Sequence, residues 1–168
     1  MTRTRTAALL VTVAAALALS AACGKGAAPA PAAGAPADTV RLVAATVGNL
    51  GTVVTDRNGY TVYLFTKDTT DPSVSTCTGS CAAMWPPLLA GTGEVELDGI
   101  DRALVGTVKR TDGTEQLTIN KRPLYRYAKD AAPGEARGQG VSGAWFAATP
   151  DGRTATASAE STDTGYGY

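Results

Sequence analysis

The sequence predicts an all-β protein in which two pseudo-repeats of short antiparallel strands pack as one compact, sandwich- or barrel-like domain. Three observations support this. From Arg41 onward, β-branched and aromatic runs alternate with Gly, Asn, Asp and Pro, as in strands joined by turns. The motif Tyr-x-aromatic-x-x-Asp occurs at residues 63–68 and again at 125–130. No stretch of this region shows a sustained helical period.

The two motif copies lie 62 positions apart, and their surroundings match at the same offset. Asn58 corresponds to Asn120. A tryptophan follows each copy, Trp85 in the first half and Trp145 in the second. The chain therefore predicts two structurally related halves.

The first half begins with a predicted hairpin of residues 51–56 and 60–66. Asn58-Gly59 between them supplies the positive φ angles of a tight turn. Residues 80–84 have room for a single helical turn. Trp85-Pro86-Pro87-Leu88 lacks two backbone donors, so we expect an extended segment held in the core by Trp85 rather than a paired strand.

The second half repeats this plan. Strands are predicted at residues 104–110, 115–119, 124–128 and 144–149, with a turn at Asp112-Gly113. Residues 94–102 are acidic and turn-rich and are predicted to join the halves. The glycines of residues 138–143 are expected to form the bend that a cysteine pair holds in the first half.

The amino terminus carries an export signal, because Arg3 and Arg5 precede an apolar run over residues 7–19. This run is too short to span a membrane. Small residues then lead into Cys23, which resembles the lipobox of bacterial lipoproteins. The resemblance implies cleavage before Cys23, lipidation of its thiol, acylation of the new amino terminus with palmitate or a similar chain, and anchoring to the cell membrane. The alternative is an ordinary secretory signal that leaves Cys23 free.

Composition suggests five segments along the chain. We expect a signal peptide at 1–22, a lipid-anchored Ala/Pro/Gly linker at 23–39, a first β repeat at 40–93, a second at 94–157 and a flexible tail at 158–168.

Charge and composition reduce the range of possible functions. The 168 residues include 15 basic and 15 acidic side chains, and loss of Arg3 and Arg5 leaves a net charge of about −2. The basic pairs Lys109-Arg110 and Lys121-Arg122 are expected to be solvated, so no nucleic-acid partner is predicted. The chain contains no histidine, the commonest general base and transition-metal ligand, and we expect no metal or cofactor.

The three cysteines fit an exported lipoprotein. Lipid on Cys23 leaves Cys77 and Cys81, for which we expect a disulfide that holds a local bend. The alternative is a redox-active or copper-binding pair with Met84 nearby.

Several segments together resemble one family: 63–68, 77–82, 85–88, 123–125 and 138–141. They are similar to predicted bacterial lipoproteins with a Yx(FWY)xxD motif, described as a secreted repeat of unknown function. The resemblance covers roughly residues 50 to 152. It implies an exported, often lipid-anchored repeat protein and brings no reaction, ligand or catalytic residue.

The motif aromatics favour a structural role. On a strand, Tyr63 and Phe65 share one face, as do Tyr125 and Tyr127. Aromatics at this spacing fill a core or a cross-strand ladder. The alternative is a stacking platform for a sugar or another flat ligand.

Asp68 and Asp130 follow these aromatics, a few residues before a proline. We expect each carboxylate to accept hydrogen bonds from backbone N–H groups and to start a turn. The alternatives are a carboxylate pair with glycosidase-like chemistry and a hard-cation site.

The sequence thus predicts a lipid-anchored extracytoplasmic protein that meets the membrane through Cys23. We expect a non-catalytic binding or structural module of the cell envelope, acting on an envelope ligand or protein. The alternatives are an envelope redox or metal-handling protein using Cys77, Cys81 and Met84, and a hydrolase using Asp68 and Asp130.

Overall fold

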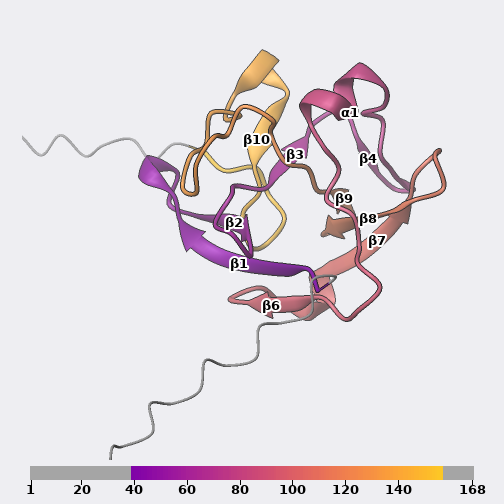
Figure 1. Ribbon diagram of the computed structural model, residues 1–168, viewed down its shortest axis with the longest axis horizontal. Coiled ribbons are helices and arrows are strands. Elements are labelled where there is room, and N and C mark those ends of the chain that lie inside the picture. Colours follow the sequence, from indigo (N-terminus) through magenta and orange to yellow (C-terminus); the bar gives the residue numbers. More distant parts are fainter. Residues whose placement is uncertain (1–38, 157–168) are drawn as a thin grey trace, which may run out of the picture. The chain divides into compact units, whose positions relative to one another are not determined.

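The structure is a computed structural model that describes residues 39–156 (Figure 1). The predicted signal peptide, Cys23, the linker up to residue 38 and the tail at 158–168 lie outside the described residues. Within residues 39–156 the chain is built mainly of short strands, which form four small sheets and no closed barrel. The all-β prediction is confirmed.

One sheet has the order β2-β1-β6. Strand β1 (Arg41–Thr46) pairs antiparallel with β2 (Thr52–Asp56), and the short 3-10 helix η1 (Gly48–Leu50) connects them. Strand β6 (Glu96–Asp98) lies parallel to β1 on its other side. The segment predicted to be only a joint between the halves therefore contributes an edge strand.

A second sheet belongs to the second repeat and has the order β7-β8-β9. It is an antiparallel meander of β7 (Val105–Lys109), β8 (Glu115–Ile119) and β9 (Arg122–Pro123). The 3-10 helix η2 (Arg102–Leu104) leads into it. Strands were predicted at 104–110 and 115–119, and both are confirmed.

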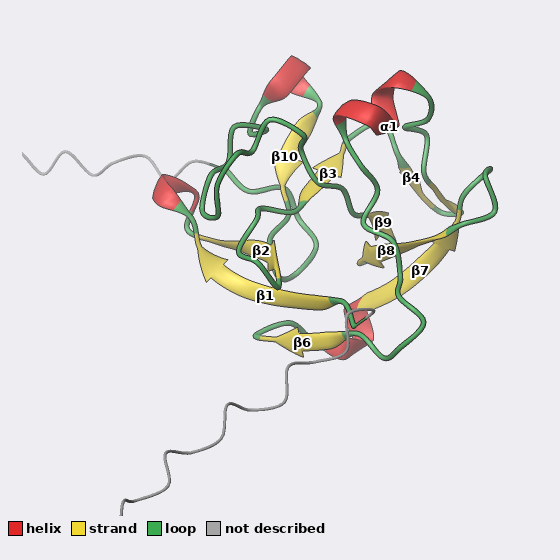
Figure 2. Ribbon diagram, in the orientation of Figure 1, coloured by secondary structure: helices red, strands yellow, loops and turns green. Residues whose placement is uncertain are grey.

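The two remaining sheets have two strands each. Strand β3 (Tyr63–Phe65) pairs antiparallel with β10 (Trp145–Ala147), so the first repeat is joined to the end of the second (Figures 1 and 2). Strands β4 (Thr69–Thr70) and β5 (Ser73–Val74) form a small hairpin directly after the first motif.

Two short helical turns occupy corresponding places in the repeats. Helix α1 (Ser80–Met84) matches the single turn predicted there. The 3-10 helix η3 (Val141–Gly143) begins 61 positions after the start of α1, close to the offset between the motif copies. Figure 2 shows both helices at the same end of the view, η3 beside β10 and α1 beside β4. Gly140 and Gly143, at φ 73° and 61°, form the predicted glycine bend.

The strand predicted at 124–128 is wrong. Only Tyr125 is paired, in isolated bridges to Tyr63 and to Pro87. The next backbone donors turn to another segment, because Arg126 N–H donates to the Pro86 carbonyl and Ala128 N–H to the Met84 carbonyl. The chain here exchanges partners from residue to residue, so no continuous ladder forms.

The prolines of the Trp85–Leu88 segment lie outside any strand, as predicted. The Pro86 carbonyl still accepts a hydrogen bond from Arg126 N–H, and Leu88 N–H donates to the Leu124 carbonyl while its own carbonyl accepts from Leu117 N–H. Trp85 is buried.

The core consists of two clusters on opposite faces of β3. Tyr63 belongs to an aromatic cluster that includes Trp85, Tyr125 and Trp145. Leu64 belongs to an aliphatic cluster, whose fully buried members include Leu42, Val54, Leu117, Ile119 and Leu124. Because successive strand residues point to opposite faces, the single short strand β3 contributes side chains to both clusters.

Candidate functional site

The two motif copies meet at their tyrosines. Tyr63 N–H donates to the Tyr125 carbonyl at 2.8 Å, and Tyr125 N–H donates to the Tyr63 carbonyl at 3.0 Å. Both side chains are fully buried. This reciprocal pair of bonds is the centre of the pseudo-symmetry between the repeats.

Each tyrosine then binds the aspartate of the other copy. Tyr63 Oη donates to Asp130 Oδ2 at 2.7 Å, and Tyr125 Oη donates to Asp68 Oδ2 at 2.7 Å. We call these two bonds the crossed clasp. The tyrosine and the aspartate of one motif copy therefore do not bind each other, and each binds a residue of the other copy. The spacing within a motif does not indicate this pairing.

The second oxygen of each carboxylate closes a loop. Asp68 Oδ1 accepts from the backbone N–H and the hydroxyl of Thr76, both at 2.8 Å. Asp130 Oδ1 accepts from Arg137 N–H at 2.9 Å. The aspartates do accept backbone N–H bonds, but the donors lie at the far end of each loop.

Burial shifts the pKa values of side chains in the crossed clasp. Removal from water raises the pKa of Tyr63 and of Tyr125 well above the ordinary value, and the neighbouring aspartate raises each further. Burial also raises the pKa of the Asp130 carboxyl, although the bonds from Tyr63 and Arg137 N–H oppose this shift. Both phenols therefore remain protonated donors at neutral pH.

A four-ring stack lies beside the clasp, in the order Tyr127, Trp85, Trp145, Phe65. The centroids of Trp85 and Trp145 are 3.9 Å apart with planes at 1°. Tyr127 stacks on Trp85 at 4.0 Å, and Phe65 stacks on Trp145 at 4.1 Å. The rings alternate between the repeats, and the two outer rings are partly exposed. The predicted packing role of these aromatics matches their contacts.

The clasp tyrosines contact this stack by their edges. Tyr63 lies 5.5 Å from Trp85, and Tyr125 lies 5.1 Å from Trp145, both near perpendicular. A β-carbon on Gly138 would lie 2.7 Å from Cε1 of Tyr63 and 2.9 Å from Cη2 of Trp85. Gly138 N–H also donates to Tyr63 Oη at 3.2 Å. Gly138 therefore permits a close approach, whereas sequence reasoning assigned its segment only a bend.

Sequence reasoning missed a buried arginine. Arg110 was expected in solvent, but it is buried, and its Nη1 donates to Ser75 Oγ at 2.5 Å and to Gln116 Oε1 at 2.7 Å. Its Nη2 donates to the Cys77 carbonyl at 2.9 Å. Ser75 Oγ lies 2.8 Å from Tyr125 Oη, so hydrogen bonds connect Arg110 with the clasp. An arginine that directly follows a strand of mostly exposed side chains carries no sequence signal of burial.

The two folded-region cysteines form a disulfide between Cys77 and Cys81, with Cα atoms 5.3 Å apart. Cys77 is buried against the aromatic cluster, and Cys81 packs partly against it. Met84 is 39% exposed. Within residues 39–156, no group of three or more His, Cys, Asp or Glu side chains is placed to hold a metal ion.

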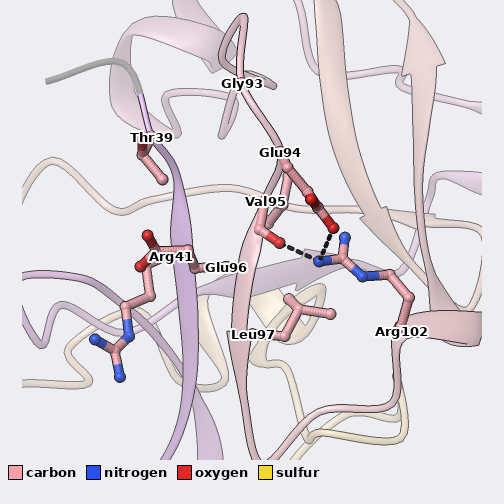
Figure 3. A pocket seen from close by; sticks show the side chains of 8 residues that line it. All are labelled: Thr39, Arg41, Gly93, Glu94, Val95, Glu96, Leu97 and Arg102. Carbon is pink, nitrogen blue, oxygen red and sulfur yellow. Dashed lines mark hydrogen bonds and ion pairs between the residues drawn. The ribbon is translucent and has the colours of Figure 1, made fainter. Parts of the chain in front are cut away.

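The described surface also carries open cavities. The one in Figure 3 has a volume of about 690 Å³ and is lined by Thr39, Arg41, Gly93, Glu94, Val95, Glu96, Leu97 and Arg102. Arg102 bonds there to the Glu94 carboxylate and to the Val95 carbonyl. A second cavity of about 520 Å³ is lined by Asp68 with Lys121 and Arg122 and does not include Asp130.

These features define a class of protein, a two-repeat all-β module whose motif side chains bind one another across the repeats. A family model described as a secreted repeat of unknown function matches residues 44–89 and 106–149, more than half of the chain. The chain belongs to this family, and each match contains one motif copy. No curated protein and no solved structure matches the chain.

Membership of a secreted family indicates an extracytoplasmic location. Among residues 39–156, no helix has the length and apolar character that a membrane crossing requires.

Proposed function

We propose that the protein is a lipid-anchored, non-catalytic module of the cell envelope, tied to the membrane through Cys23 and offering its folded unit to an envelope ligand or protein. The crossed clasp is the observation that supports a non-catalytic role. Each motif carboxylate accepts one bond from a tyrosine of the other repeat and at least one from its own loop. A carboxylate engaged in this way orders the fold, which supports a structural role for the motif.

The anchor rests on the sequence around Cys23. The apolar run and the small residues before this cysteine resemble a lipobox, and the family is secreted. Two or more acyl chains hold a protein stably to a bilayer, whereas a single chain gives reversible binding. The disulfide between Cys77 and Cys81 leaves Cys23 as the remaining cysteine for lipid.

The cavity of Figure 3 is the best candidate for the ligand contact. Its lining has both charge signs, from Arg41 and Arg102 on one hand and Glu94 and Glu96 on the other. A site of this kind suits a polar ligand with both donors and acceptors, such as an envelope peptide or glycan. It lies at the start of β1, on the edge strand β6, on the loop before it and on η2.

Metabolic labelling with palmitate tests the anchor. We expect label on the wild-type protein, accumulation of the precursor in globomycin, and recovery in the membrane fraction. Cys23→Ala should lose the label and leave the membrane. The double variant Cys77→Ala/Cys81→Ala is the matched control, because it removes two thiols and should keep the label. A Cys23→Ala protein that remains equally membrane-bound would contradict the anchor.

A further inference from the structure

A continuous set of aromatic contacts joins the surface of the folded unit to its two buried tyrosines. Tyr127 is partly exposed and stacks on Trp85 at 4.0 Å, and Trp85 stacks on Trp145 at 3.9 Å. Tyr63 contacts Trp85 at 5.5 Å, and Tyr125 contacts Trp145 at 5.1 Å. Three of these rings are stacked, and each tyrosine meets the stack edge to face, so an electron can tunnel from ring to ring over short distances.

Each buried tyrosine also has its own proton acceptor. The Tyr63 hydroxyl lies 2.7 Å from Asp130 Oδ2, and the Tyr125 hydroxyl lies 2.7 Å from Asp68 Oδ2. A phenol that loses an electron becomes a strong acid and must release its proton. A base within hydrogen-bond reach takes that proton directly, without water entering the core.

We propose that this cluster is a one-electron donor site, in which the stack passes an electron to an oxidant at the Tyr127 edge and Tyr63 or Tyr125 becomes a neutral radical. The oxidant is an outer-sphere acceptor, either a metal complex or an organic radical, that takes an electron without forming a bond. The proposal goes beyond the binding role and does not depend on the lipid anchor.

The step balances within the cluster. The oxidant gains one electron and Tyr63 loses one, while the stacked rings return to their starting state. The Tyr63 O–H bond breaks and its proton forms an O–H bond with the Asp130 carboxylate. The same step applies to Tyr125 and Asp68. A one-electron reductant reverses it, and the proton returns to the tyrosine.

Packing alone does not require this arrangement. Phenylalanine would fill the positions of Tyr63 and Tyr125 without burying a hydroxyl beside a carboxylate, which costs solvation of both groups. The crossed clasp explains a bond between the repeats. Both clasp tyrosines also contact the tryptophan pair, as an electron path requires.

Flash oxidation of the purified full chain with photogenerated ruthenium(III) tris-bipyridine tests the proposal. We expect a tyrosyl radical, detected by transient absorption and electron paramagnetic resonance. Its rate of formation should not depend on the concentration of buffer base, because the acceptor is internal. Asp68→Asn/Asp130→Asn should slow it by about 100-fold, the scale of a positioned base, and make it buffer-dependent.

Tyr63→Phe/Tyr125→Phe should lose most of the radical yield. Tyr60→Phe is the matched control, since Tyr60 lies under the Arg126 guanidinium at 4.5 Å and is not one of the stacked rings. A double Tyr variant with the radical yield of Tyr60→Phe overturns the proposal. The wild-type protein alone also decides it if the variants do not fold, because radical formation that rises with buffer base overturns it equally.

Discussion

Tyr63 of the first repeat donates its buried hydroxyl to Asp130 of the second, 67 positions along the chain, at 2.7 Å. Tyr125 makes the mirrored bond to Asp68, 57 positions away. A motif that looks self-contained in sequence is therefore satisfied only by its other copy. This dependence makes the two repeats one folding unit, and it can be measured.

A double-mutant cycle measures the crossed bond. Tyr63→Phe leaves a buried carboxylate without its donor and should lower the free energy of unfolding by about 1–3 kcal/mol. Tyr63→Phe and Asp130→Asn should couple by at least about 0.5 kcal/mol in urea unfolding. The cycle of Tyr63 with Asp68, its partner within the motif, is the control and should give coupling near zero. Equal coupling in both cycles would contradict the crossed arrangement.

Gly138 should tolerate no side chain. Gly138→Ala places a β-carbon against the Tyr63 and Trp85 rings, and overpacking of this kind costs about 1–3 kcal/mol of unfolding free energy. Gly93→Ala is the matched control, because its nearest neighbour would be Thr39 Oγ1 at 4.0 Å. Thermal and urea unfolding of the two variants give the comparison. Equal stability of both would show that the core moves to admit the methyl group.

Arg110 should stabilise the fold, whereas its neighbour Lys109 should not. Arg110→Met removes the donor for Ser75, Gln116 and the Cys77 carbonyl and should lower the free energy of unfolding by about 3 kcal/mol. Lys109→Met is exposed and should change it by less than about 0.5 kcal/mol. Urea unfolding tests both, and a stable Arg110→Met variant would show that the buried network relaxes without cost.

The raised pKa of Asp130 predicts a sign for pH dependence. Its pKa is higher in the folded than in the unfolded protein, so its contribution to stability is present below the ordinary carboxyl pKa and is lost as pH rises through the raised value. The stability of wild type relative to Asp130→Asn should therefore fall as the pH rises above the ordinary carboxyl range in urea unfolding.

Asp151 supplies the control with the opposite sign. The hydroxyl of Thr149 and then Arg153 lower the pKa of its carboxyl. Its contribution is present above the ordinary carboxyl pKa and is lost as pH falls. The stability of wild type relative to Asp151→Asn should therefore rise with pH over the acidic range. Parallel pH trends for the two variants would contradict the pKa shift of Asp130.

Much of the local structure could be predicted from the sequence. The turn around Asn58-Gly59, the strands at 105–109 and 115–119, and the helical turn at Ser80–Met84 follow from residue preferences over a few positions. The hairpin predicted from residues 51–56 and 60–66 is wrong beyond this turn, because its strands are linked only by the bridge of Thr55 to Thr61, while β2 pairs with β1 and β3 pairs with β10. The sequence could not exclude a strand at 124–128, because its residue pattern is compatible with one. Its backbone instead divides its bonds between Tyr63 and Pro86, and pairing over such distances leaves no local trace.

The sequence by itself determined the all-β class, the two-repeat plan, the secreted family and the cysteine pair, since each depends on residue type, spacing or recurrence. Only the tertiary structure decided which tyrosine binds which aspartate, that Arg110 is buried, and that Trp85 and Trp145 stack face to face. Each of these is a contact between segments far apart in the chain. Such contacts follow from how the two halves pack around their pseudo-symmetry centre, and this packing cannot be predicted from a pattern within one half.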